Sequence, residues 1–109
     1  MATAETWYRF DTEVDEYGGV SLYRSEFDAV KKTPCGVWLV FRGGWQPKRR
    51  FVLLNSRKKY AHPDIDSALQ SFIARKNLQL RILSARHDQT AAALEMAALR
   101  LEELRAKAA

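Results

Sequence analysis

The sequence predicts an α+β fold: an antiparallel four-stranded β-meander packed on one long C-terminal helix that extends as a coiled coil. Eleven of the twelve aromatic residues lie in the first 63 residues, where short apolar segments alternate with turn residues. From Asp64 to Ala109 the chain contains no Gly or Pro and repeats its apolar residues at heptad spacing. We therefore expect a β-sheet module at residues 1–63 and a helix at residues 64–109, together one domain with a helical extension.

The alternation of apolar and polar residues locates the strands. Trp7–Val14 alternates as a half-buried strand does, and Val37–Phe41 is apolar enough for the centre of the sheet. The apolar phase of Val20–Val30 changes within the segment, which predicts a bulge or a bend near Arg24-Ser25. A fourth strand is expected at Arg50–Leu54. The short connections between these segments favour antiparallel neighbours.

The helix is expected to have two different halves. Asp64 is a candidate N-cap. Between Ile65 and Leu83 further apolar residues lie off the heptad stripe, which predicts that this half packs on the sheet as well as on a partner; these residues are Ile65, Phe72, Leu78 and Ile82. Beyond Arg86 the pattern is that of a projecting coiled coil. A break at residues 84–89, with Asp88 capping a second helix, is the alternative.

The heptad stripe predicts a homodimer through the helix. Its members recur four and three residues apart, as in a seam that faces a partner helix. The dimerisation residues are Leu69, Ile73, Leu80, Leu83, His87, Leu94, Leu101 and Leu104. The flanking positions hold Arg86, Arg100 and Arg105 but no acidic residue, so they do not indicate a parallel or an antiparallel pair.

The net charge of +5 is unevenly distributed. Residues 1–30 carry two basic and seven acidic groups, whereas residues 31–60 carry nine basic groups and no acidic group. This concentration predicts a surface that attracts an acidic partner, with Trp45 as an anchor that is buried on binding. The partner-binding candidates are Trp45, Lys48, Arg49, Arg50, Arg57, Lys58 and Lys59. Because Phe51 and Tyr60 are interleaved with them, phosphate contacts and base stacking on a nucleic acid are the alternative.

The sequence contains no catalytic constellation. Cys35 is the only cysteine, and neither His62 nor His87 has a second histidine at metal-ligand spacing. We therefore expect no enzyme activity, cofactor or metal. No apolar run approaches the length of a membrane span and no signal peptide is recognisable, so we expect no membrane partner and an intracellular location.

The junction of sheet and helix resembles small uncharacterised proteins of tailed bacteriophages. In that family a strand ending in a basic "RKRYA-P"-like stretch leads into a helix carrying "AL-SFI-RK--Q". The similarity covers roughly residues 7–85, and the matching residues here are Arg57, Lys58, Lys59, Tyr60, Ala61 and Pro63, then Ala68, Leu69, Ser71, Phe72, Ile73, Arg75, Lys76 and Gln79. The resemblance implies a phage or prophage accessory protein in the cytoplasm of the bacterial host.

These observations lead to one hypothesis and two alternatives. The hypothesis is a non-enzymatic phage-type binding protein that occludes a host protein or protein–nucleic-acid complex, as an inhibitor of host defence systems such as CRISPR effectors does. The first alternative is a nucleic-acid-binding module that uses the basic residues between 48 and 59. The second is a structural or assembly protein whose coiled coil is its function.

Overall fold

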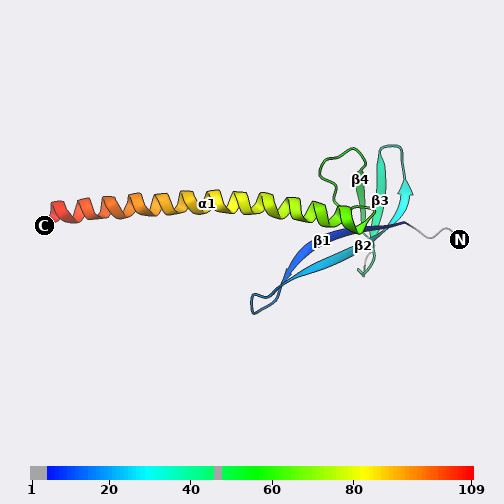
Figure 1. Cartoon of the computed structure of the whole chain (residues 1–109), viewed down its shortest axis with the longest axis horizontal. Coiled ribbons are helices and arrows are strands. Elements are labelled where there is room, and N and C mark those ends of the chain that lie inside the picture. Colours follow the sequence, from blue (N-terminus) through cyan, green and yellow to red (C-terminus); the bar gives the residue numbers. More distant parts are fainter. Residues whose placement is uncertain (1–4, 46–47) are drawn as a thin grey trace. The chain divides into compact units, whose positions relative to one another are not determined.

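A four-stranded antiparallel sheet and one long helix make up the fold, as the sequence predicts (Figure 1). The computed structural model describes residues 5–45 and 48–109. The elements are β1 (Thr6–Val14), β2 (Val20–Lys32), β3 (Gly36–Phe41), β4 (Arg49–Leu53) and α1 (Ile65–Ala108). The chain divides into two compact units, Met1–Ala74 and Arg75–Ala109. The first unit therefore contains the sheet and the beginning of α1.

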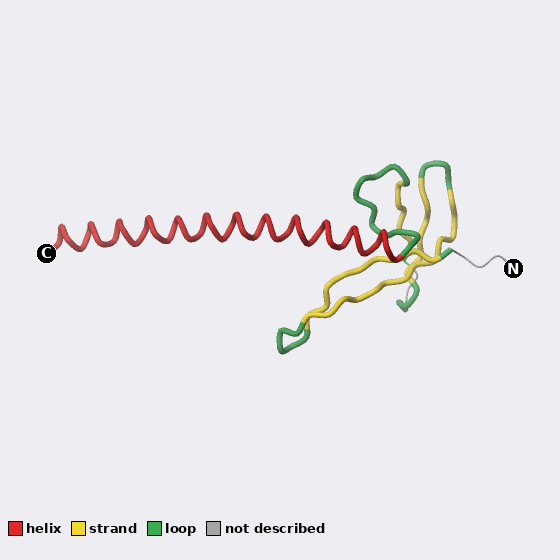
Figure 2. The backbone as a smooth tube through the Cα atoms, in the orientation of Figure 1, coloured by secondary structure: helices red, strands yellow, loops and turns green. Residues whose placement is uncertain are grey.

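The strands lie in the order β1-β2-β3-β4, each paired with the one that precedes it in the sequence (Figure 2). Tight turns explain this meander. At the first turn, the Asp15 carboxylate accepts hydrogen bonds from the backbone N–H groups of Tyr17 (2.9 Å) and Gly19 (2.7 Å), and Gly18 adopts a φ of +83°. At the second, the Thr33 hydroxyl accepts a 3.1 Å bond from the N–H of Gly36.

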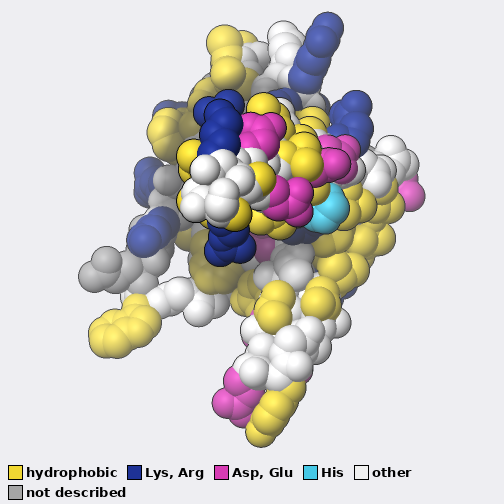
Figure 3. Space-filling view, turned by 90° about the vertical axis from the view of Figure 1, so that its left-hand side faces the viewer, with side chains coloured by type: hydrophobic (Ala, Val, Ile, Leu, Met, Phe, Trp, Pro, Cys, Tyr) yellow, Lys and Arg dark blue, Asp and Glu magenta, His cyan; other side chains and the backbone are white. Residues whose placement is uncertain are grey.

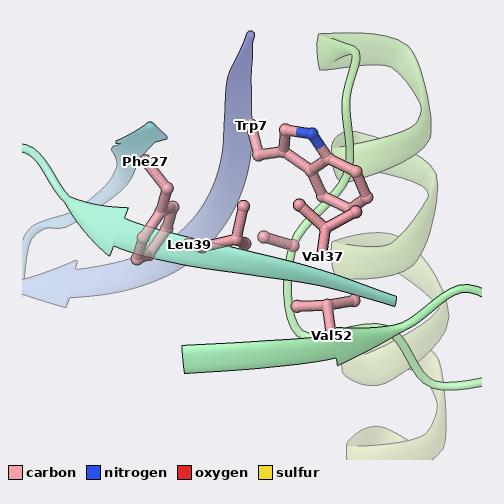
Figure 4. Packing of buried hydrophobic residues seen from close by; sticks show 6 residues of the cluster. Trp7, Phe27, Val37, Leu39 and Val52 are labelled. Atoms are coloured by element: carbon pink, nitrogen blue, oxygen red, sulfur yellow. The ribbon is translucent and has the colours of Figure 1, made fainter. Parts of the chain in front are cut away.

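The core lies on one face of the sheet. In the registers of the three strand pairs, Trp7 is opposite Phe27, Phe27 is opposite Phe41, and Val37 is opposite Val52, so these side chains share a face. Figure 4 shows this cluster of buried hydrophobic side chains. Its buried members are Trp7, Phe27, Val37, Leu39, Val52 and Ala61.

The bulge in the second strand is not where the sequence analysis placed it. Pairing of β1 with β2 runs without interruption through Arg24 and Ser25, and the irregularity falls between Ala29 and Lys31, where β2 pairs with β3. The change of apolar phase has another cause. β3 pairs only with residues 27–32 of β2, so the far half of the β1–β2 hairpin is exposed on both faces. Apolar residues there, such as Leu22, are exposed, so their alternation does not report which face of the strand packs on the core.

The helix begins where the sequence analysis expects it. The Asp64 carboxylate accepts hydrogen bonds from the N–H (2.7 Å) and hydroxyl (3.0 Å) of Ser67, which confirms the N-cap. The backbone bond from Ser67 contributes most to lowering the pKa of Asp64. From Ile65 the helix continues through residues 84–89 to Ala108 without a break. The continuous helix is therefore confirmed, and the alternative of a helical hairpin is wrong.

Only the beginning of the helix is buried. Ala68 is fully buried and Phe72 is half-buried, but Leu78 and Ile82 are exposed. Both residues lie in the second unit, so their predicted packing on the sheet stays a prediction. Their burial by a partner chain stays a prediction.

We predict that Gly36→Ala destabilises the protein. A Cβ atom at Gly36 would lie 2.3 Å from the Val52 carbonyl oxygen and 2.5 Å from Cζ of Phe51, so β4 would have to shift away from β3. Overpacking of this kind costs about 1–3 kcal/mol in the free energy of unfolding. Urea denaturation followed by circular dichroism measures it, with Ser21→Ala on the exposed hairpin as the control. Equal midpoints for Gly36→Ala and wild type would contradict the close β3–β4 contact.

Candidate functional site

The first candidate surface is the basic surface, formed by the start of β4 and by the turn that follows it. Its residues are Lys48, Arg49, Arg50, Arg57, Lys58 and Lys59. All are exposed except Lys59, which is half-buried. The sheet places Arg49 and Arg50 opposite Val40 and Leu39 of β3, so their side chains lie on opposite faces of β4.

Tyr60 joins the two halves of the basic surface. The guanidinium carbon of Arg50 lies 3.5 Å from the centroid of the Tyr60 ring, a cation–π contact that holds the turn against β4. Arg9 lies 4.3 Å from the same centroid and donates a 2.9 Å hydrogen bond to the Tyr60 carbonyl oxygen. The Tyr60 and Phe27 rings also meet in an edge-to-face arrangement, with 5.6 Å between centroids. The structure therefore joins β4 to the turn through Arg50 and Tyr60, whereas Arg49 lies on the opposite face of β4. That the six cations bind a partner together stays a prediction.

Arg9 is a residue that the sequence analysis missed. It lies 51 residues from Tyr60 in the sequence, in a segment whose other charges are mostly acidic. Its guanidinium also pairs with the Asp11 carboxylate at 3.1 Å. No local pattern indicates such a long-range contact, because alternation reports only the face on which a strand residue lies.

Several carboxylates in and beside β1 and β2 pair with cations outside the basic surface. Arg42 binds Glu26 at 3.1 Å and also binds Asp28, and its hydrogen bond to Asp28 is the main cause that raises the pKa of Arg42. Lys32 binds Glu5 at 2.6 Å. Within residues 5–45 and 48–109, none of the six cations of the basic surface forms an ion pair with a carboxylate. The basic surface therefore keeps its positive charge.

The aromatic residues near these cations differ in whether their rings are already in contact with other side chains or are exposed to solvent. Tyr60 is in contact with two guanidinium groups, and the Phe51 ring packs against Trp38 with 5.0 Å between centroids. Trp45, in contrast, is 99% exposed. With Phe41, Gly44 and Lys48 it lines a hollow of about 530 Å³. Gln46 and Pro47, between Trp45 and Lys48, lie outside the described residues. Trp45 is thus the aromatic side chain that is available to a partner at this surface.

The second candidate surface is the heptad stripe of α1. From Ile73 onward its apolar residues are exposed, and Leu94 has 72% of its surface accessible. Leu69, within the first unit, is half-buried, and the His87 side chain is 82% exposed. In Figure 3, where the C-terminal end of α1 faces the viewer, hydrophobic side chains lie among charged ones on the helix surface. Leucines at heptad spacing on an exposed helix are typical of a seam that a second helix covers.

The described residues were also searched for a metal site and for a membrane-spanning helix. No group of three or more His, Cys, Asp or Glu side chains is placed to hold a metal ion in the described part of the chain. None of the helices in that part is both long enough and apolar enough to pass through a lipid bilayer. Comparisons of this chain with protein-family models, curated proteins and solved structures found no match. The similarity to phage proteins therefore stays a prediction.

We predict that the heptad stripe, and not exposed apolar surface in general, holds two chains together. The double substitution Leu94→Asp with Leu101→Asp should halve the mass measured by light scattering, because charged residues in a seam cannot be desolvated without partners. Met96→Asp with Leu99→Asp is the matched control: it makes the same chemical change on α1 at exposed residues outside the stripe.

Circular dichroism should confirm that both double variants remain helical. A wild-type chain that is a monomer at all concentrations would contradict the prediction. Equal dissociation of the stripe variant and the control variant would contradict it as well.

Proposed function

We propose that this protein is a non-enzymatic binding protein that pairs through α1 and attaches its basic surface to an acidic protein surface. The observation that carries the proposal is the separation of charge. The carboxylates of Glu5, Glu26 and Asp28 pair with Lys32 and Arg42, while the six cations of the basic surface have no carboxylate partner in the described residues. Cations without partners attract an oppositely charged surface over a long range and orient it.

The state of the aromatic residues favours a protein over a nucleic acid as partner. Stacking of bases requires exposed ring faces, but the Tyr60 ring is in contact with Arg9 and Arg50, and the Phe51 ring packs on Trp38. Trp45 is 99% exposed, and tryptophan is among the residues that most often anchor protein–protein interfaces.

The similarity to phage accessory proteins supplies the biological setting of the proposal. The target would be a protein or protein–nucleic-acid complex in the cytoplasm of a bacterial host. Attachment would occlude a surface of that complex, with host defence complexes such as CRISPR effectors as the target class that we propose. Two basic surfaces in a paired molecule would strengthen the attachment by raising the effective concentration of the second contact.

We predict that charge reversal within the basic surface weakens binding to an acidic polypeptide by about tenfold, equivalent to about 1.4 kcal/mol. The variant is Lys48→Glu with Lys58→Glu. Its control is Lys31→Glu with Arg81→Glu, which changes the net charge equally at exposed cations outside the basic surface. Fluorescence anisotropy with labelled polyglutamate measures the affinity, and a mixed-sequence DNA duplex is the competing probe.

The outcomes separate the two classes of partner. Binding of polyglutamate that weakens in the surface variant but not in the control supports the proposal. Tighter binding of the duplex, with an affinity that falls steeply as salt rises, would instead favour the nucleic-acid alternative. Absence of binding to both probes would contradict a binding role for the basic surface.

A further inference from the structure

The two edges of the sheet differ at one position, because β1 has a backbone partner at Tyr8 and β4 has none on its outer side within the described residues. On the outer edge of β1, the N–H of Tyr8 donates to the carbonyl oxygen of His62 at 2.7 Å, and the N–H of His62 donates to the carbonyl oxygen of Tyr8 at 2.9 Å. β4 is the other edge strand. Within residues 5–45 and 48–109, no strand and no isolated bridge lies on the side of β4 that faces away from β3.

The register shows which groups of β4 are free. Val52 is opposite Val37, and beyond the end of the strand the N–H of Leu54 donates to the carbonyl oxygen of Cys35 at 3.0 Å. In an antiparallel pair alternate residues turn their backbone groups toward the neighbouring strand. The residues between them therefore point outward: Arg49 and Phe51 with both N–H and C=O, and Leu53 with its N–H. The Leu53 carbonyl already accepts a 3.4 Å bond from Ser56.

The side chains of the residues that carry these free groups form a row along β4 that changes from charged to apolar. Arg49, Phe51 and Leu53 share the face of β4 opposite to the core, since Val52 is in the core. Arg49 is exposed and has no carboxylate partner in the described residues, the Phe51 ring is held against Trp38, and Leu53 is 53% exposed. The row thus runs from a positive end to an apolar end.

We propose that β4 binds an extended acidic segment of a partner protein by adding it to the sheet as a fifth strand. The proposal rests on the proposed function and specifies how the basic surface recognises its partner. Main-chain hydrogen bonds to Arg49, Phe51 and Leu53 supply the attachment, and the side-chain row selects the sequence. The segment that fits carries an acidic residue opposite Arg49 and apolar residues opposite Phe51 and Leu53.

The charge of the edge also selects against the β4 strand of a second copy. Edge strands are templates for pairing with another chain, and basic residues on an edge repel an identical edge. Two β4 strands side by side would bring arginines of both copies together. An acidic strand instead supplies the carboxylates that Lys48, Arg49 and Arg50 lack in the described part of the chain.

The test compares Leu53→Pro with Leu53→Ala in the full chain. Proline removes the outward N–H of Leu53 and adds a ring at the edge, and no bond to β3 is lost because that N–H does not face β3. The probe is a fluorescein-labelled peptide, Glu-Thr-Glu-Thr-Val-Thr-Val-Thr, together with its reverse sequence, because the added strand can run in either direction. We expect one of the two to bind Leu53→Ala at least about tenfold more tightly than Leu53→Pro, equivalent to about 1.4 kcal/mol.

A second pair of probes does not depend on the folding of a variant. The second probe is the same peptide with N-methyl groups on the alternate residues whose amides would face β4. It keeps its charge but loses these hydrogen-bond donors. We expect the wild-type chain to bind it at least about tenfold more weakly than the unmodified peptide, equivalent to about 1.4 kcal/mol. Equal affinity for the methylated and unmodified peptides would overturn strand addition, and so would equal affinity of the Pro and Ala variants.

The remaining outcomes separate this inference from the proposed function. Binding of polyglutamate without binding of either peptide would overturn strand addition and leave the proposed function standing. Absence of binding to polyglutamate and to the peptides would overturn both. A mass increase without peptide that Leu53→Pro abolishes would identify a second copy as the occupant of the edge. Preference of the wild-type chain for the DNA duplex would identify a nucleic acid. Either of these last two results would overturn the inference.

Discussion

The pair of backbone hydrogen bonds between Tyr8 and His62 is the constraint on which the arrangement of the first unit depends. β4 ends at one edge of the sheet and His62 lies at the other, so residues 54–62 must cross from edge to edge. This crossing places Ala61 in the core with no exposed surface and brings Tyr60 between Arg9 and Arg50. It also fixes the point from which Asp64 caps the helix.

The same crossing makes the two edges chemically unequal. At one edge His62 pairs with Tyr8 of β1. At the other edge, the outward groups of Arg49 and Phe51 and the N–H of Leu53 have no backbone partner within the described residues. Carboxylates in and beside β1 and β2 pair with Arg42 and Lys32, which do not belong to the basic surface. The open edge is therefore also the positive edge. A surface with unpaired backbone groups and unpaired cations is suited to an extended acidic partner, whereas a paired and neutralised edge is not.

Local patterns in the sequence were sufficient to predict each element of this fold. Alternation identified the strands, and the helix followed from its heptad spacing and the absence of Gly and Pro. A polar stretch at residues 84–89 does not break α1, because strong helix formers flank it and Asp88 interrupts no backbone hydrogen bond.

Burial in β1 and several contacts of the candidate site could not be predicted from the sequence, because they depend on segments that are distant along the chain. Trp7 and Phe10 lie on opposite faces of β1 and are both buried, while Val14 on the same strand is exposed. Burial there depends on how far the neighbouring strands extend, which alternation alone does not show. For the candidate site, composition identified the cations of the basic surface. The role of Arg9, the engagement of Tyr60 and Phe51, and the open edge of β4 all depend on pairings between segments remote in sequence.

Hydrogen exchange of backbone amides, followed residue by residue by nuclear magnetic resonance, tests the inequality of the two edges most directly. We expect the amides of Tyr8, His62, Arg50 and Val52 to exchange slowly, because each faces a hydrogen-bonded neighbour. The amides of Arg49 and Phe51, within the same strand as Arg50 and Val52, should exchange much faster because they point away from β3. Protection of Arg49 and Phe51 equal to that of Val52, in the protein without any partner, would contradict the open edge.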